Sequence, residues 1–467
     1  MRDVHALPVA ISRPETPPAC HGCRDRGPMN ILIFHSIPYP HVEYHRGIDH
    51  SRHDVTYFGP AEALATVPEG LRCSKVARPG AAGACEEARS WMAAHPCVAF
   101  DRVIALSEGE RLEAARLREW LGLPGDRSEK VAALRNKLWM KQAVAAAGLR
   151  VPRFASLPAF LARRDGPPWQ GRTVLKPHSG AASEDVAVFA TAAQARAAVL
   201  GFCSGIPRLD ALEAVDACGD FEVEEYVEGP VLHFDGVVAG GTVFALAASR
   251  YLNTCLDYAR GAPLGSIHIP LDERMRHWVA RALEGLGMRD GCFHLEAIEQ
   301  GGELVFLEID HPVDVPHGIA TFERATGIHL PSVELHRLLG EAGENEVPPL
   351  GREAGSADPG RCWHGWFAVP GHHLGCATHP GLEGIAVFRR SEAVVGWSEL
   401  PAGAPLPGRV TYRTDALPLA GIVATAAPPQ TQAWMESLFA AVQWKPAAPH
   451  AVPEAAPGPA AALPATA

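Results

Sequence analysis

The stretch from Cys292 to His311 constrains the fold more than any other part of the chain. Its sequence, CFHLEAIEQGGELVFLEIDH, contains two runs in which apolar and polar residues alternate, separated by a Gly-Gly pair. Alternation with period two predicts strands, and a Gly-Gly pair between two such runs is typical of a hairpin turn. We therefore expect an antiparallel hairpin with its turn at Gly301-Gly302.

This hairpin would bring three carboxylates together on one face. Folding about Gly302 places Glu296 roughly opposite Glu308, and Asp310 shares the face of Glu308 because side chains two apart in a strand point the same way. Clustered carboxylates repel one another unless a cation lies between them, and Mg²⁺ takes oxygen ligands of this kind. A divalent-cation site and a solvated polar face remain open as interpretations. The other face is expected to be apolar, with Phe293, Leu295, Leu307 and Ile309.

Length and composition narrow the class of protein. The 467 residues suffice for roughly two to four domains. The net charge of -11 argues against a general nucleic-acid binder. No apolar run approaches the ~18–20 residues of a membrane span. The 11 cysteines are scattered, which indicates reduced thiols and a cytoplasmic protein. We expect neither nucleic acid nor a membrane as partner.

The N-terminal part predicts a small α/β domain. Apolar runs at 29–34, 53–58 and 101–106 read as buried parallel strands, and residues 112–121 have helical spacing. Strands that alternate with helices form α/β layers. The histidine-rich segment 35–53 either lines a ligand crevice at the strand ends or consists of loop residues, and the loop interpretation is favoured.

A second group of motifs contains lysines and a loop of small residues. An amphipathic helix is expected over Ser128 to Ala147, and it carries Lys137 and Lys141. A strand then ends at Lys176, and the loop His178 to Ser183 follows. Small residues let backbone N–H groups approach phosphate oxygens, and lysines add positive charge. A phosphate-binding loop and a surface hairpin both remain open.

The order of these motifs resembles that of the ATP-grasp superfamily, and within it the carboxylate–amine ligases that join amino acids. A helical lysine is followed by Leu-Lys-Pro, the small-residue loop, a strand ending in Glu-Glu-Tyr-Val-Glu-Gly, then His-x-Asp-Gly and the Glu…Glu hairpin. The resemblance covers residues 29–430. It implies an α/β fold of the ATP-grasp type, in which two α+β subdomains sandwich ATP.

The resemblance also implies a division into domains. A pre-ATP-grasp α/β domain would precede the ATP-grasp domain, and a small β-rich element with strands at 365–369, 384–388 and 409–412 and a helix at 431–442 would follow it. The expected ranges are a disordered leader 1–28, the N-terminal α/β domain 29–125, the ATP-grasp domain 126–345, the C-terminal β-rich subdomain 346–445 and a disordered tail 446–467.

Roles for individual residues follow from the same resemblance. Two lysines would hold the ATP phosphates, the loop would cover them, and a hinge would frame the adenine largely through backbone groups. The cofactor-binding residues would be Lys137, Lys176, Ser179, Gly180, Ser183, Glu224, Glu225, Tyr226, Val227, His233 and Asp235. The ligands of Mg²⁺ (or Mn²⁺) would be Glu296, Glu308 and Asp310, and the catalytic contacts Arg250 and His311.

The sequence departs from the family pattern at several positions, among them Asp310 in place of the usual asparagine, alanines in the loop in place of glycines, Pro312 and Val231. Pro312 occupies the place of an arginine that normally meets the transferred phosphate or the substrate carboxylate, and Val231 stands where a ribose-binding acid is often found. The implied function is an ATP- and Mg²⁺-dependent ligase that forms an amide from a carboxylate and an amine through an acyl phosphate. The alternatives are an ATP-binding scaffold without catalysis, a carrier-protein aminoacyl ligase, and a biotin-dependent carboxylase, which the missing arginine weakens. The expected substrates are small molecules, namely amino acids as the resemblance implies, and a homodimer is left open.

Overall fold

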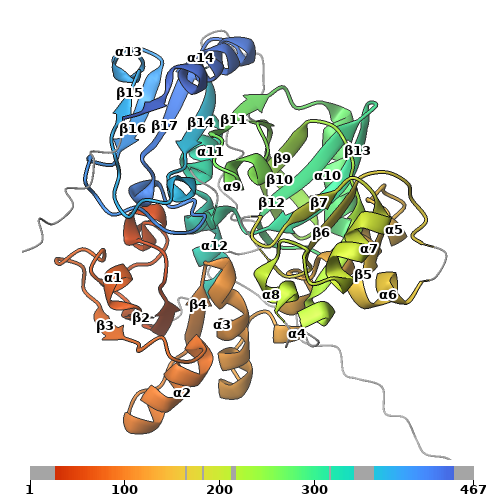
Figure 1. Ribbon diagram of the computed structural model, residues 1–467. Coiled ribbons are helices and arrows are strands. Elements are labelled where there is room, and N and C mark those ends of the chain that lie inside the picture. The colour runs from red at the N-terminus through yellow and green to blue at the C-terminus, as the bar shows by residue number, and fades with distance from the viewer. Residues whose placement is uncertain are drawn as a thin grey trace, which may run out of the picture.

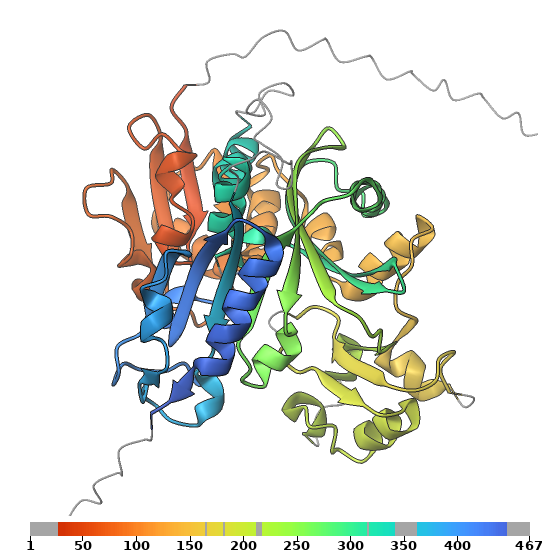
Figure 2. The same ribbon diagram turned by 90° about the horizontal axis from the view of Figure 1, so that it is seen from above.

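The computed structural model describes residues 27–163, 166–180, 183–211, 217–314, 317–340 and 362–445. The predicted tail, residues 1–26 of the predicted leader, residues 341–361 and Ala181-Ala182 of the small-residue loop lie outside these ranges. Within them, every helix is too short or too polar to cross a bilayer. Figures 1 and 2 show the N-terminal region in red and orange, a small sheet in yellow, and a large sheet running from green to blue.

The N-terminal sheet is parallel, as the apolar runs predicted. Strand β1 pairs with β2 on one side and β4 on the other, so the strand order is β3-β2-β1-β4. Strands β2 and β3 are added on one side of β1 and β4 on the other, so the order of the strands reverses between β1 and β4, while all four strands remain parallel. Strand β3 and helix α2 were not predicted. The bounds are β1 Asn30–Phe34, β2 Asp54–Gly59, α1 Ala61–Leu64, β3 Ser74–Ala77, α2 Ala84–Ala94, β4 Arg102–Ala105 and α3 Glu108–Leu121.

The predicted single helix from Ser128 to Ala147 is wrong, because two helices occupy this stretch. Helix α4 covers Ser128–Ala133 and helix α5 covers Lys137–Ala146. The side chain of Asn136 accepts hydrogen bonds from the N–H groups of Leu138 and Trp139, and this cap starts the second helix. The break leaves Lys137 at the first position of α5.

A small antiparallel sheet follows, with strand order β5-β8-β6-β7. One of its faces packs against helices α6 to α8 through a core that includes Leu175, Phe221 and Val223. The charged residues Lys176, Glu222 and Glu224 alternate with these in sequence, so they occupy the other face. The bounds are β5 Phe154–Ser156, α6 Leu157–Ala162, β6 Thr173–Pro177, β7 Ala187–Phe189, α7 Ala192–Leu200, α8 Pro207–Asp210 and β8 Phe221–Glu225.

The large sheet has eight strands in the order β13-β12-β9-β10-β11-β14-β17-β16. Its neighbouring strands are antiparallel, and the blue C-terminal strands continue the green ones in Figures 1 and 2. The C-terminal strands and the acid hairpin thus belong to one sheet. The bounds are β9 Val231–Ala239, β10 Thr242–Leu252, β11 Leu264–Ile269, β12 Gly291–Gln300, β13 Glu303–Asp310, β14 Trp363–Val369, β16 Val394–Glu399 and β17 Leu419–Thr425.

Several C-terminal predictions need correction. The run at 384–388 does not form a strand; residues Ala386–Arg389 form helix α13, after Gly384 turns the chain with φ +79°. Residues 409–412 lie outside any strand, and β16 was not predicted. The predicted last helix is present and starts earlier. The remaining bounds are α9 Cys255–Ala259, α10 Glu273–Gly285, α11 Gly318–Thr326, α12 Leu330–Leu339, β15 Leu382–Glu383, α14 Pro428–Ala441 and β18 Gln443–Trp444.

The acid hairpin has the predicted turn and the expected pair of glutamates, and its register shifts by one residue directly after Glu296. Gly301 and Gly302 both have positive φ, at 61° and 82°, as a two-residue hairpin turn requires. Glu296 pairs with Glu308, and His294 pairs with Asp310. A bulge follows Glu296, so that Ala297 pairs with Phe306.

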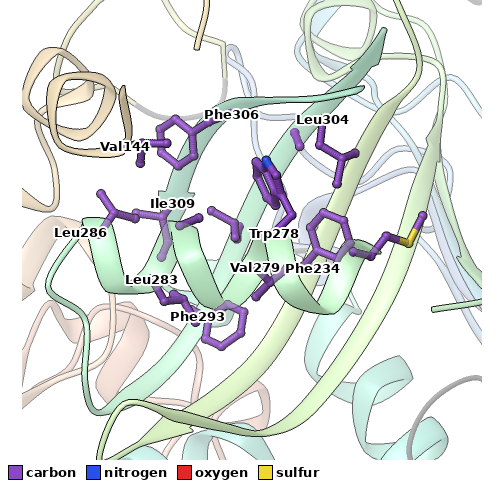
Figure 3. Packing of buried hydrophobic residues seen from close by; sticks show 14 of the residues in the cluster. Val144, Phe234, Trp278, Val279, Leu283, Leu286, Phe293, Leu304, Phe306 and Ile309 are labelled. Atoms are coloured by element: carbon purple, nitrogen blue, oxygen red, sulfur yellow. The ribbon is translucent and has the colours of Figure 1, made fainter. Parts of the chain in front are cut away.

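The bulge changes which residues reach the core. The apolar face of the hairpin packs on helices α5 and α10, where Phe306 lies near Val144 and where Trp278 lies beside Phe234 in Figure 3. The prediction that Leu307 belongs to this face is wrong, because the extra residue of a bulge reverses the alternation. Leu307 packs instead with Val227 and Val305 on the side of the cleft described next.

Candidate active site

A cleft lies between the small sheet and the acid hairpin of the large sheet. It brings together most of the residues that the sequence singled out. Among its lining residues are Lys137, Val174, Lys176, Gly180, Ser183, Glu224, Glu225, Tyr226, Val227, Val231, Leu256, Glu296, Ile298, Leu307 and Glu308.

One end of the cleft is apolar and has a free backbone donor. The N–H groups of Glu225 and Tyr226 donate to the carbonyl oxygens of Arg153 and Arg172 at 2.8 and 3.0 Å. Within the described chain, the N–H of Val227 has no hydrogen-bond partner. Apolar side chains, Ile298 and Leu307 among them, line the same end. A flat heterocycle such as adenine fits an apolar slot lined by an unpaired backbone donor.

The other end of the cleft is charged. Lys137 Nζ donates to the carbonyl oxygen of Gly180 at 2.6 Å and lies 2.8 Å from Glu308. The N–H of Lys137 donates to His178 O at 2.7 Å, which ties the loop to the start of α5. Burial would lower the pKa of Lys137, but Glu308 and Asp310 outweigh burial and raise it. The side chain is therefore a cation at neutral pH.

A second lysine enters the cleft from the small sheet. Lys176 Nζ lies 2.7 Å from Glu224 and 3.8 Å from Glu222. Burial would lower its pKa, and the two glutamates raise it instead. The two lysines are thus fixed in position by carboxylates, as cationic contacts for a polyphosphate need to be.

The two glutamates of the hairpin lie side by side across β12 and β13. Glu296 Oε1 accepts a hydrogen bond from the Tyr251 hydroxyl at 2.9 Å and lies 3.3 Å from His294 Nε2. Burial would raise the pKa of Glu296, but His294 lowers it. Loss of hydration, together with the charge of Glu308, raises the pKa of Asp310 to about 8. A cation between these oxygens would relieve their repulsion, so the carboxylates fit a divalent metal ion.

A buried hydrogen-bonded network of Asp235, His233 and His294 contacts Glu296 through the ring of His294. Asp235 Oδ2 lies 2.7 Å from His233 Nδ1, and Asp235 Oδ1 lies 2.8 Å from His294 Nδ1. His233 Nε2 lies 2.6 Å from the Ser266 hydroxyl. Each ring nitrogen of the two histidines has a polar neighbour, so the trio forms a hydrogen-bonded network rather than an open set of metal ligands. His233 and Asp235 do not line the cleft, although they were predicted to bind the cofactor.

The structure does not bring the two predicted catalytic residues to the cleft. Ser249 pairs with His233 and shares its face, so Arg250 points to the opposite side of the sheet. There Arg250 donates to Gln432 at 2.6 Å. His311 is buried at 2% exposure and does not line the cleft. Ser179 and Asp310 do not line the cleft either.

The burial of His311 predicts a measurable acid sensitivity. Burial, reinforced by the charge of Arg111, lowers the pKa of His311 to about 3. Below an unfolded pKa of about 6.5, the unfolded chain binds a proton that the folded chain does not, so stability falls by about 1.4 kcal/mol per pH unit. Between pH 7 and pH 5 the wild type should lose about 2 kcal/mol more than His311→Phe. Urea unfolding at both pH values measures this difference.

The control for this measurement is His277→Phe, since His277 is an exposed ring on helix α10. It should lose stability with acid to the same extent as the wild type. Equal acid losses in His311→Phe and the wild type would contradict the buried, uncharged state of His311.

A second cavity, of about 580 Å³, lies where the N-terminal sheet, helix α11 and residues 410–414 meet. Ser36 and Ser107 follow β1 and β4 at the reversal of strand order, and their hydroxyl oxygens are 3.0 Å apart. Ligands of open α/β sheets bind at such reversals. The histidine-rich segment contributes His41 to this cavity, whereas His35 is buried with Nε2 3.1 Å from Ala63 O.

Some residues of the site were not assigned from sequence. Lys141 contacts Glu222 and Glu224, and its position four residues after Lys137 places both lysines on one face of α5. Tyr251 shares a face with Ser249, so strand alternation favoured it over Arg250 as a contact of the acid face. Thr254, Cys255 and Leu256 also line the cleft, and no sequence pattern indicated them.

Comparison with known proteins gives similarity at the level of structure. No family model and no curated protein matches the sequence. An L-amino acid ligase from Bacillus licheniformis superposes with a TM-score of 0.63 at 18% identity, covering 90% of this chain and 99% of that one. An N5-carboxyaminoimidazole ribonucleotide synthetase from Thermotoga maritima gives 0.55 at 15% identity, covering 89% and 99%.

A third similar structure holds nucleotide. The biotin carboxylase domain of the Hydrogenobacter thermophilus 2-oxoglutarate carboxylase, in complex with MgADP and bicarbonate, gives a TM-score of 0.55 at 13% identity, covering 90% of this chain and 91% of that one. These similarities span about nine tenths of this chain and more than nine tenths of each compared chain. The chain therefore has the ATP-grasp fold, as its motifs predicted.

Proposed function

We propose that this ATP-grasp chain is an ATP-dependent ligase that joins a carboxylate to an amine. One observation carries the proposal: Lys137 and Lys176 reach one cleft from α5 and the small sheet, and Glu296 and Glu308 line it from the large sheet. Lysines that neutralise phosphate charge beside a pair of metal-binding carboxylates suit phosphoryl transfer.

ATP is the proposed nucleotide. The apolar end of the cleft, with the free N–H of Val227, would hold adenine, and Lys137 and Lys176 would hold the phosphates. Gly229 supports the hinge, because a Cβ there would lie 2.1 Å from Glu299 O and no other residue fits. Val231 lines the cleft, so the ribose would meet an apolar side chain at that position.

Mg²⁺ is the proposed metal, and Glu296 and Glu308 would hold it, with Asp310 beside them. When bound, the ion would neutralise phosphate charge and orient the γ-phosphoryl group. The paired register of Glu296 and Glu308 across the hairpin supports this assignment.

The chain's own residues bind and orient the reactants. The carboxylate oxygen of the acid forms a bond to the γ-phosphorus as the bond to ADP breaks, which gives an acyl phosphate. Lys137 and Lys176 would stabilise the phosphate charge during this transfer. The amine nitrogen then bonds to the acyl carbon, and phosphate and the amine proton leave. Residues that exclude water from the cleft would protect the acyl phosphate from hydrolysis.

The second cavity is the proposed place for an organic substrate. Its volume of about 580 Å³ fits a small molecule, and it combines apolar walls with polar groups, Ser36, His41 and Arg413 among them. The similarity to an L-amino acid ligase favours amino acids as substrates. We place the reaction in the cytoplasm on the basis of the scattered cysteines, since the described ones form no disulfide.

The test is ADP release by the purified protein with ATP and Mg²⁺ against amino acids offered singly and in pairs, followed by mass spectrometry. ADP together with a condensed product that depends on one pair would establish the ligase. Tight ATP binding without turnover on any pair would favour the scaffold alternative or a carrier-bound substrate. Bicarbonate-dependent ADP release without an amine would favour carboxylation.

A further inference from the structure

Lys141 is a buried cation that the proposed reaction does not use directly. Its side chain is 0% exposed, and it does not line the cleft. Its Nζ lies 2.6 Å from Glu222 and also donates to Glu224. It lies over the ring of Phe154 at 5.0 Å from the centroid.

Lys141 shares its partners with Lys176. Glu224 Oε2 accepts from Lys141 while Glu224 Oε1 lies 2.7 Å from Lys176. Glu222 Oε1 lies between the two lysines, at 2.6 and 3.8 Å. The four side chains form a buried quartet with two positive and two negative charges, of which Lys176 and Glu224 line the cleft while Lys141 and Glu222 do not.

The balance of charge within this quartet matters for the cleft. Without Lys141, two buried carboxylates would face Lys176 alone, and the quartet would carry a net negative charge. That charge would hold Lys176 toward the glutamates and would repel a polyphosphate at close range in a medium of low dielectric constant. With Lys141 present, the two carboxylates are partly neutralised, so the positive charge of Lys176 acts on a ligand in the cleft.

We propose that Lys141 is a positioning residue, which neutralises Glu222 and Glu224 so that Lys176 remains available to the nucleotide phosphates. The inference rests on the proposed binding of ATP in the cleft. It predicts a role that depends on the charge of the ligand, because the quartet acts on phosphates and not on adenine.

The test compares the binding of ATP and AMP by isothermal titration calorimetry. Lys141→Met should weaken ATP binding by about tenfold or more, and AMP binding by a clearly smaller factor, because AMP carries fewer phosphate charges. The double variant Lys141→Met/Glu222→Gln restores a neutral cluster and should bind ATP within about threefold of the wild type. Glu222→Gln alone should bind ATP at least as tightly as the wild type.

The matched control is Lys130→Met, which removes an exposed lysine of helix α4 that pairs with Asp126. This variant should leave the affinities for ATP and for AMP unchanged. Equal weakening of ATP and AMP, or no recovery in the double variant, would overturn the inference and indicate a merely structural lysine. Weaker ATP binding in Glu222→Gln would also overturn it, even if Lys141→Met does not fold. If the wild type binds ATP and Lys141→Met binds it with equal affinity, only this inference fails. If the wild type does not bind ATP at all, the proposed function itself is wrong.

Discussion

Glu308→Ala should abolish ATP turnover while leaving the chain folded. Glu308 contacts Lys137 at 2.8 Å and pairs with Glu296 across the hairpin, so its loss removes one proposed metal ligand and the partner of a lysine proposed to bind phosphate. Contributions of this kind amount to several kcal/mol of transition-state stabilisation, or roughly a 10³-fold loss of rate. ADP release at saturating Mg²⁺ and ATP measures the effect, with circular dichroism to verify folding.

The control is Glu303→Ala on the same strand. Glu303 lies near the hairpin turn with a side chain 59% exposed, and it pairs with Arg150. An exposed ion pair contributes little, so this variant should retain its turnover. Full turnover in Glu308→Ala would remove the metal assignment, and equal losses in both variants would indicate a damaged hairpin rather than a lost ligand.

Asp235→Asn should give the largest loss of stability among these variants. Asp235 contacts both His233 and His294, and all three side chains are almost fully buried. Removing one member of a buried charged network leaves the others without compensation, which costs roughly 3–5 kcal/mol. The free energy of unfolding in urea at pH 7 measures this cost.

The pH dependence of the same variant gives an independent check. Burial would raise the pKa of Asp235, but His294 and His233 lower it in the folded chain. A lowered carboxyl pKa stabilises the fold above the unfolded value of about 4, and this contribution is lost as the pH falls further. The difference between wild type and Asp235→Asn should therefore shrink below about pH 4. Asp54→Asn, at an exposed pair with Arg72, should change stability by less than about 1 kcal/mol.

The sequence predicted those features that depend on local patterns. The Gly-Gly turn fixes the register of the acid hairpin from Gln300–Glu303 to Ala297–Phe306, but the expected pairing of Glu296 with Glu308 depends on the bulge after Glu296, without which Glu296 would lie opposite Leu307. The three parallel strands of the N-terminal sheet followed from their apolar runs. The ATP-grasp fold followed from the order of motifs rather than from any one of them.

Other features depend on contacts that no local pattern reveals. The bulge after Glu296 sends Leu307 to the cleft, and alternation alone predicts the opposite. Arg250 was predicted as a catalytic contact because of its charge. Alternation from Ser249 instead directs its side chain to the opposite face of the sheet, where it contacts Gln432 of helix α14. Lys141 pairs with Glu222 and Glu224, which lie 81 and 83 residues further along the chain. Such pairs become visible only when the chain is folded.

The order of strands in the large sheet has a consequence for the growing chain. Strand β11 pairs with β10 on one side and with β14 on the other, and β14 is synthesised only after the whole acid hairpin and helices α11 and α12. Until the ribosome has added residues 363–369, β11 is an open edge, and unpaired edges of this kind promote aggregation. Residues 410–414, which wall the second cavity, follow later still. A nascent chain would thus complete the cleft between the small sheet and the acid hairpin before its second cavity, and a chain truncated before β14 would expose the edge permanently.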